Sequence, residues 1–360
     1  MFYYLAIDIL ILILGYFLIN RRVYVGKIVI DGNKWFYILT GLVLIFFSSF
    51  RGDFTPDYSG YVDIYNRFKE VSLVNIVQRP LFSYPEKGYL LFQFFVKKIF
   101  NNQLYIFIVS SIIIVTFNLA FFKQDAENDL LAVMLFLEAG LYYSSFNLMR
   151  QMLAASIVVI ASKFLYEKKF FPYFVIILIA SIIHTSAIIM IPFYFICRIK
   201  VEKKGIILFP IILALMVTVL PVAISFVGQY YWGWYYKDAS TAVGYSWKNV
   251  VLPLAISIFA FVIYLLNRDN YGSDKERKKV INNIWLNASF FYSAFYLLGM
   301  QFSLAQRFAS FFSTYTLCFF CNQVSRNKYR TYITAGAIIV LIYFGYITKD
   351  SFPYYFIWDR

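Results

Sequence analysis

The sequence has few charged residues, few cysteines and a single histidine. Only 14% of its 360 residues are Asp, Glu, Lys or Arg, whereas an average soluble domain has about 25%. This scarcity of charge excludes a disordered chain and an ordinary cytosolic enzyme. One histidine and three cysteines argue against a zinc site and exclude a disulfide scaffold.

Common nucleotide- and metal-binding motifs are also missing. The chain has no P-loop, no Gly-x-Gly-x-x-Gly after a strand, no His-Glu-x-x-His and no Asp-x-Asp. Cys318 and Cys321 share one helix face in an apolar run, so packing explains them better than redox or metal chemistry. We therefore predict that the protein uses no metal and no cofactor.

Apolar residues, by contrast, are abundant along the whole chain. Hydrophobic residues make up 61% of the sequence and aromatic residues 22%. We predict an all-α polytopic transmembrane bundle of about 11–13 spans that forms one integral membrane domain over residues 1–360. The twelve candidate spans are 2–19, 35–50, 103–122, 130–146, 148–166, 170–184, 186–197, 205–226, 250–266, 281–300, 308–323 and 331–347.

One apolar segment, residues 88–100, is too short to span a membrane. Thirteen helical residues cover about 20 Å, against roughly 30 Å of hydrocarbon. We predict a re-entrant or interfacial helix here, which makes residues 51–102 one external loop region. A second external loop, 227–249, contains the aromatic run YYWGWYY. That run is typical of an interfacial belt or of platforms for stacking sugars.

Basic residues indicate the orientation of the chain. The net charge is +14, which we attribute to basic cytoplasmic loops rather than to nucleic-acid binding. With the N-terminus outside, the inner loops contain 19 of the 33 basic residues. The runs 170–184 and 186–197 form either one tilted span or a hairpin. We prefer the hairpin, because it returns the basic residues after 197 to the inside, and it places His184 at its outer turn.

Polar side chains gather at the predicted outer ends of the spans, where ionisable groups are functional candidates. They are Arg51, Asp53, Asp57, Tyr58, Glu86, Arg150, Gln151, His184 and, in the short loop between 300 and 308, Arg307. Structural explanations remain open for each: helix capping, snorkelling of arginine, or a packed histidine. Taken together, the arginines, carboxylates and imidazole predict an external site for an anionic, lipid-linked substrate and for acid–base chemistry.

The order of these segments resembles a known family. FRGDFTPDYSGY is followed by PEKGYLLFQFFVKKI, then by FNLMRQMLAAS with its Arg-Gln-x-x-Ala element, and then by SIIHTSA. This order resembles the EpsG family of bacterial exopolysaccharide proteins, which belongs with the Wzy-type O-antigen and capsule polymerases. The resemblance is good over residues 35–200 and general beyond them.

The resemblance implies a multi-pass glycosyltransferase of the bacterial cytoplasmic membrane. Such a polymerase joins oligosaccharide repeat units carried on undecaprenyl diphosphate at the outer face, and works beside a flippase and a chain-length regulator. Two other functions remain open: a flippase or transporter of lipid-linked sugars, and a membrane O-acyltransferase that uses His184. The sugar and its linkage do not follow from the resemblance.

The implied reaction assigns roles to the candidate residues. The leaving lipid diphosphate needs fixed cations, for which Arg51 and Arg150 are the candidates. The acceptor hydroxyl needs a base, and His184, Asp53 and Glu86 are available. Imidazole is a competent base near pH 7, whereas nearby arginines lower the pKa of a carboxylate. We therefore favour His184 as the base, or alternatively as a donor to the diphosphate, with Asp53 orienting an arginine or a sugar hydroxyl.

Overall fold

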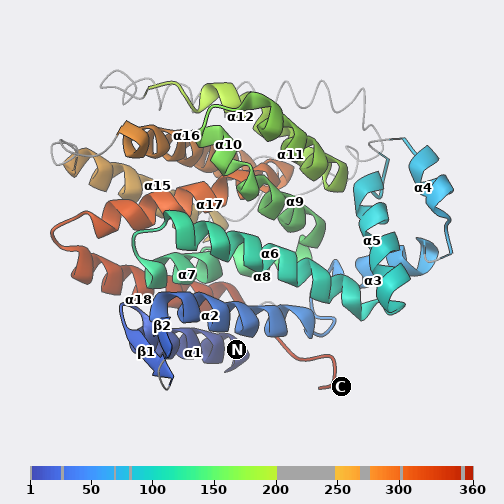
Figure 1. The fold of residues 1–360 in the computed structure, drawn as a ribbon, viewed down its shortest axis with the longest axis horizontal. Helices are drawn as coiled ribbons and strands as arrows, with labels where there is room; N and C mark the ends of the chain where they lie inside the picture. Colours follow the sequence, from blue (N-terminus) through green and yellow to red (C-terminus); the bar gives the residue numbers. More distant parts are fainter. Residues whose placement is uncertain are drawn as a thin grey trace. The chain divides into compact units, whose positions relative to one another are not determined.

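Helices make up nearly all of the structure, a computed structural model that describes residues 2–25, 28–68, 70–80, 83–200, 248–267, 276–300, 303–349 and 353–359 (Figure 1). The chain divides into two compact units. One comprises Met1–Phe164, Lys169–Ile188 and Thr331–Arg360, and the other comprises Leu165–Lys168 and Ile189–Arg330.

The first unit is built around helix α6, which packs against α2, α5, α7 and α9, while α9 also packs against α11. Phe107, Ile114 and Phe122 of α6 are fully buried in its core. Its helices are α1 (Phe2–Leu18), α2 (Gly32–Ser49), α3 (Tyr58–Phe68), α4 (Leu73–Gln78), α5 (Lys87–Phe100), α6 (Leu104–Asp125), α7 (Asp129–Glu138), α8 (Leu141–Asn147), α9 (Met149–Ile160), most of α10 (Ser162–Tyr166), α11 (Phe170–Ile183) and nearly all of α18 (Arg330–Lys349).

Polar side chains define the starts of several of these helices. The side chain of Asp31 accepts a hydrogen bond from the backbone N–H of Asn33 at the start of α2. Asn128 caps α7 in the same way, and Ser72 caps α4. Each cap satisfies a backbone donor that has no partner within the helix, so the helix begins at that residue.

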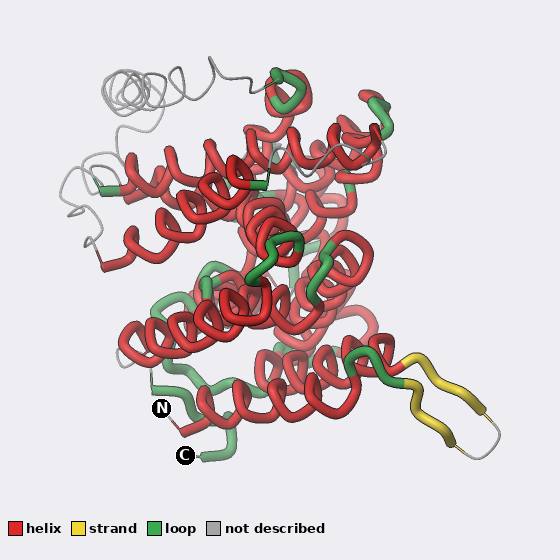
Figure 2. The backbone as a smooth tube through the Cα atoms, turned by 90° about the vertical axis from the view of Figure 1, so that its left-hand side faces the viewer, coloured by secondary structure: helices red, strands yellow, loops and turns green. Residues whose placement is uncertain are grey.

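A β-hairpin connects α1 and α2, within the stretch 20–34 that was predicted to be an inner loop. Strands β1 (Arg22–Val25) and β2 (Ile28–Asp31) pair antiparallel, with Arg22 opposite Asp31 and Val25 opposite Ile28. Figure 2 shows the hairpin, in yellow, projecting from the helices. It was not predicted, because four-residue strands leave only a weak alternating pattern in a sequence.

Two predicted spans are interrupted. The run 130–146 breaks between α7 and α8 at Gly140, whose φ of 91° lies in the left-handed region that favours glycine. The run 148–166 breaks at Ala161, between α9 and α10. The continuous hydrophobicity of these runs does not reveal where the backbone leaves the helical conformation.

The run 170–197 is also divided, and the division falls at the histidine. Helix α11 ends at Ile183, His184 is extended with φ of −149°, and a 3₁₀ turn, η1 (Thr185–Ile189), follows. Helix α12 (Met190–Ile196) then begins in the other unit. His184 therefore lies where the helical conformation is interrupted, at the position predicted for a turn. The hairpin itself stays a prediction.

The second unit contains α12, α15 (Lys248–Leu266), α16 (Glu276–Gly299) and α17 (Ser303–Ser325). Helices α16 and α17 pack along each other, and both contact α15. Phe193 of α12 meets Phe312 of α17 edge to face at 5.1 Å between ring centroids, and Phe291 of α16 stacks on the same ring at 5.3 Å. Aromatic packing of this kind forms the core of the unit.

The predicted all-α class is confirmed. Three helical stretches are long and apolar enough to span a membrane, namely 104–125, 129–147 and 330–347, and five shorter apolar helices accompany them in the described part of the chain. The short helix is confirmed as α5, and the region 51–102 contains α3 and α4 besides. The span 205–226 and the aromatic loop 227–249 lie outside the described residues, apart from the start of α15. The single domain over residues 1–360 and the external side of 51–102 stay predictions.

Candidate functional site

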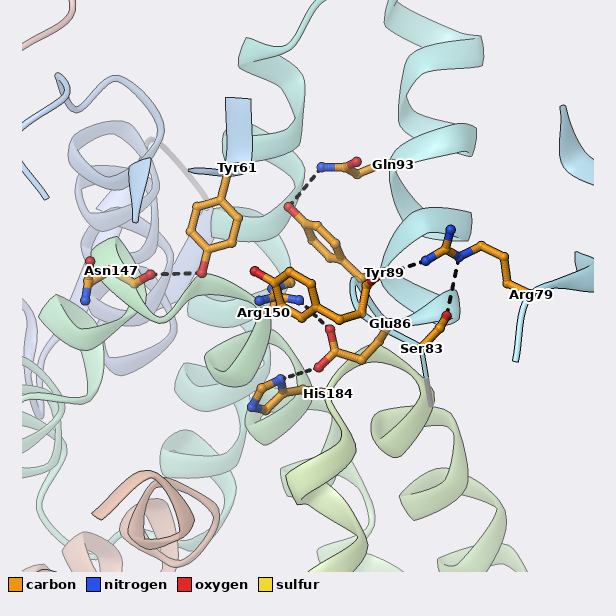
Figure 3. A network of polar contacts seen from close by, with 10 residues as sticks. Tyr61, Arg79, Ser83, Glu86, Tyr89, Gln93, Asn147, Arg150 and His184 are labelled. Atoms are coloured by element: carbon orange, nitrogen blue, oxygen red, sulfur yellow. Dashed lines mark hydrogen bonds and ion pairs between the residues drawn. The ribbon is translucent and has the colours of Figure 1, made fainter. Parts of the chain in front are cut away.

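Three charged or titratable side chains from three different helix ends meet in the first unit. Glu86 precedes α5, Arg150 is the second residue of α9, and His184 follows α11. One carboxylate oxygen of Glu86 accepts a hydrogen bond from Nη1 of Arg150, and the other lies 2.9 Å from Nδ1 of His184. Figure 3 shows Glu86 between its two partners. We refer to these three residues as the Glu–Arg–His network.

The position of Glu86 explains how a helix end supplies the central group. Glu86 occupies the N-cap position of α5, but its side chain makes no capping hydrogen bond. A capping role was the simplest expectation for an acidic residue at a helix start. The carboxylate turns instead toward α9 and α11, which pack against each other. It therefore links three elements that are distant in the sequence.

Gly88 allows the start of α5 to approach α11 closely. A Cβ atom at this position would lie 2.6 Å from the carbonyl oxygen of Ile182, two residues before His184. No side chain fits there without a shift of the backbone, because real Cβ contacts are longer. The missing side chain thus brings Glu86 within hydrogen-bonding distance of the imidazole.

We expect Gly88→Ala to separate Glu86 from His184. Since the chain has one histidine, a protein with a ¹⁵N-labelled histidine and a histidine-free affinity tag gives one pair of imidazole ring signals, of which the Nδ1 signal reports the contact with Glu86. That signal should move to its position in Glu86→Gln. Gly336→Ala is the matched control, because a Cβ at Gly336 meets no atom within 4 Å. An unchanged imidazole signal in Gly88→Ala would disprove the role of the close contact.

The network is partly shielded from solvent. The side chain of Glu86 is 9% exposed, that of Arg150 14% and that of His184 18%. Burial raises the pKa of Glu86, but the hydrogen bond to His184 and the positive charge of Arg150 outweigh it and leave that pKa below its usual value. The carboxylate is therefore ionised at neutral pH and accepts hydrogen bonds from both partners.

An ionised carboxylate also determines the tautomer of the imidazole. Because a carboxylate only accepts hydrogen bonds, Nδ1 of His184 must be the donor. In the neutral ring the lone pair then lies on Nε2, on the far side from Glu86. This is how a carboxylate orients a histidine that acts as a general base.

Two tyrosine rings enclose the guanidinium of Arg150. Its Cζ lies 4.9 Å from the ring centroid of Tyr84 and 5.6 Å from that of Tyr89. Tyr84 is 69% exposed, whereas Tyr89 is fully buried and its hydroxyl accepts a hydrogen bond from Gln93. The planar group is thus held by ring faces and by Glu86, a geometry that the flexible lysine ammonium does not reproduce.

Arg51, the other predicted anion-binding arginine, has different surroundings. Its side chain is 1% exposed, and its guanidinium donates to the carbonyl oxygens of Ser48 and Phe146. Its Cζ lies 4.8 Å from the ring centroid of Phe107 and 5.3 Å from that of Phe146. Burial lowers the pKa of Arg51 to about 10, so it remains charged at neutral pH. None of its described contacts is to the Glu–Arg–His network.

The other predicted residues near Arg51 line the same part of the unit. Asp53 is exposed, and its carbonyl oxygen accepts from the hydroxyl of Tyr355. The backbone N–H of Asp57 donates to the side chain of Asn147 at 2.9 Å. Tyr58 stacks on Phe107 at 4.6 Å. The predicted roles of these three residues at the site stay predictions.

Gln151 and Arg307 lie in different units. Gln151 follows Arg150 in α9 and is buried. Arg307 lies within α17, which begins at Ser303, so its predicted place in a loop between 300 and 308 is wrong. The short polar run Gln306-Arg307 interrupts the hydrophobic pattern, but it does not end the helix. Its role as a substrate-binding residue stays a prediction.

Several residues around the network were missed in the sequence. Tyr84 and Tyr89 contact the guanidinium, Gln93 donates to Tyr89, and Asn147, just before α9, accepts from Asp57 and Tyr61. Tyrosine is so frequent in this chain that no single ring stands out. The nearest signal was their adjacency to Glu86 and Arg150. The cysteines Cys197, Cys318 and Cys321 are buried and form no disulfide bond, consistent with packing.

The fold and the site define a helical protein with membrane-length helices in which a guanidinium, a carboxylate and an imidazole meet. Comparison with protein families finds a match to the EpsG family over residues 34–356. The match covers most of the chain, including the Glu–Arg–His network, so the chain belongs to the EpsG family, as its resemblance suggested. This family and the apolar helices indicate a membrane protein and a polysaccharide polymerase. No protein of curated function and no solved structure matches the chain.

Proposed function

We propose that this protein joins oligosaccharide repeat units carried on undecaprenyl diphosphate, at the outer face of the bacterial cytoplasmic membrane. The observation that supports this proposal most directly is the Glu–Arg–His network in a chain of the EpsG family. The network combines a base and a fixed cation, the two groups that transfer from a lipid diphosphate to a hydroxyl needs.

In the proposed reaction, His184 activates the acceptor. Nε2 takes the proton of a sugar hydroxyl on the incoming lipid-linked unit. The resulting oxygen forms a bond to the anomeric carbon of the growing chain, and the bond from that carbon to the diphosphate oxygen breaks. The electron pair leaves with the lipid diphosphate, and the proton passes from Nε2 to solvent. In the neutral ring Glu86 holds the one ring proton on Nδ1, which leaves the lone pair of Nε2 available at the start of the cycle.

Arg150 stabilises the charge that develops on the leaving diphosphate. Arginine has five N–H donors, and Glu86 occupies only part of this set. A fixed guanidinium next to the diphosphate stabilises negative charge without reorganisation, so the reaction requires no metal. The exposed ring of Tyr84 on the guanidinium provides a face on which a sugar of the substrate can stack.

The remaining predicted residues take supporting roles in this proposal. Arg51 holds the backbone rather than the diphosphate, because its guanidinium is buried and donates to carbonyl oxygens. Asp57, Tyr58 and Gln151 lie in or beside the segments that shape the site. Glu86 orients His184, and Asp53 keeps its predicted role of orienting an arginine or a sugar hydroxyl.

The test is elongation of a lipid-linked oligosaccharide by purified protein in liposomes that contain neither ATP nor an ion gradient. We expect polymers of many repeat units in the presence of a metal chelator. Movement of the lipid-linked unit across the bilayer without elongation would support a flippase instead. Transfer of an acyl group to the sugar would support the O-acyltransferase. Either result, with no polymer formed, contradicts the polymerase.

A further inference from the structure

The last described residues of the chain, 353–359, pair with the backbone that follows α2. Gly52 donates its N–H to the carbonyl oxygen of Tyr355 at 2.7 Å, and Ile357 donates to that of Phe50 at 3.0 Å. These bonds form an antiparallel bridge between Arg51 and Phe356. We call residues 353–359 the terminal segment. It lies beside the first helix (Figure 2), where the rings of Tyr3 and Phe356 are 5.1 Å apart.

Side chains strengthen this pairing. The hydroxyl of Tyr354 donates to the carbonyl oxygen of Phe47 at 2.8 Å, and that of Tyr355 donates to the carbonyl oxygen of Asp53. The ring of Tyr355 lies against Gly52, where a Cβ atom would overlap it. The terminal segment therefore fits closely on residues 50–53, and a glycine is required for that fit.

The terminal segment covers the start of a stretch, residues 51–61, that is hydrogen-bonded to the turn before Arg150. Helices α8 and α9 meet at residues 146–148, and two residues later comes Arg150. The carbonyl oxygen of Phe146 accepts hydrogen bonds from Nη2 of Arg51 at 3.3 Å and from the hydroxyl of Thr55 at 3.1 Å. We call residues 146–148 the α8–α9 turn.

Two further hydrogen bonds hold a second residue of the turn, Asn147. The side-chain oxygen of Asn147 accepts a hydrogen bond from the N–H of Asp57 at 2.9 Å. The backbone carbonyl oxygen of Asn147 accepts one from the hydroxyl of Tyr61 at 2.9 Å. Four groups from residues 51–61 thus hold two consecutive residues of a turn. These four hydrogen bonds are more than the capping of a helix requires, and together they determine where α9 begins.

We propose that the terminal segment is a positioning element of the active site. It holds Arg51 and its neighbours, these hold the α8–α9 turn, and the turn places Arg150 against Glu86 and thereby orients His184. This inference rests on the proposed function for its effect on turnover. Its structural part, the coupling of residues 353–359 to His184, stands on the contacts alone.

The physical reason lies in the tolerance of such a site. A misplacement of about 1 Å in a catalytic group costs up to about 100-fold in rate. The hydrogen bond between Glu86 and Nδ1 of His184 is 2.9 Å long and spans 98 residues of sequence, so no local structure maintains it. A shift of the α8–α9 turn moves Arg150 and draws Glu86 away from the imidazole.

The test uses one added methyl group to separate the terminal segment from residues 50–53. Gly52→Ala should displace the ring of Tyr355 and break the pairing. Gly52→Ala/Tyr355→Ala should restore it, because the pairing uses backbone groups that both variants retain. Gly60→Ala is the matched control, since Gly60 is exposed in the same region and its Cβ would meet no atom within 4 Å. Elongation rates and the ¹⁵N signal of His184 Nδ1 are measured for all of them.

We expect Gly52→Ala to elongate about 10–100-fold more slowly and to shift the His184 signal toward its position in Glu86→Gln. The double variant and Gly60→Ala should resemble the wild type in both measurements. A wild-type signal in Gly52→Ala, with the terminal segment released to protease, would overturn the proposal. If Gly52→Ala does not fold, Tyr354→Phe decides, because it removes the bond from the terminal segment to the carbonyl oxygen of Phe47; a wild-type signal there overturns the proposal, and a shifted one supports it.

Failure of the polymerase function has a different signature. If the wild type elongates nothing, the proposed function is wrong, yet the imidazole signals of the same variants still decide whether the terminal segment is coupled to His184. If the wild type elongates and Gly52→Ala matches it with the segment released, the function stands and the positioning role is wrong.

Discussion

His184→Gln is expected to lower the rate of elongation by roughly two to four orders of magnitude, with little loss of substrate binding. Glutamine retains an N–H that can reach Glu86, whose carboxylate accepts from the imidazole in the wild type. It has no group that takes up a proton near neutral pH. The variant therefore keeps the hydrogen-bond geometry and loses only the base.

Initial elongation rates in liposomes and equilibrium binding of the lipid-linked unit measure the two effects separately. Thr185→Ala serves as the control, because it alters the next residue of the same turn and leaves the imidazole in place. Elongation within several-fold of the wild type in His184→Gln would reject His184 as the base. Glu86 would then be the next candidate, in preference to Asp53, since Glu86 contacts both the arginine and the imidazole.

Arg150→Lys is expected to slow elongation by about 10²–10³-fold, the usual cost of losing one preorganised donor to a developing negative charge. Lysine keeps the charge but not the planar fork that stacks against Tyr84 and Tyr89 while it bonds Glu86. Protein yield should stay near that of the wild type, because the charge balance with Glu86 is retained.

A matched substitution distinguishes this geometry from charge alone. Arg67 is an exposed arginine at the end of α3, in the same predicted external region. Arg67→Lys should elongate like the wild type. If Arg150→Lys also does so, the guanidinium only anchors its helix at the membrane surface, and the assignment of Arg150 to the diphosphate is wrong.

Long apolar runs predicted most of the helices correctly, because such runs leave few alternatives to a membrane helix. The runs 2–19, 35–50 and 103–122 correspond closely to α1, α2 and α6. The breaks at Gly140 and Ala161 were missed, since each lies inside a run that is apolar enough overall to be one span. The β-hairpin was missed because its strands are four residues long.

The sequence by itself determined the class of protein and the shortlist of functional residues. Charged groups beside apolar runs are rare, so Glu86, Arg150 and His184 could be found without a structure. Only the tertiary structure decided which of them lie in contact. The two bonds of Glu86 span 64 and 98 residues, and no local pattern encodes such distances. The same packing buried Arg51 among aromatic rings and placed Arg307 inside a helix of the other unit, because side-chain surroundings depend on which helices meet.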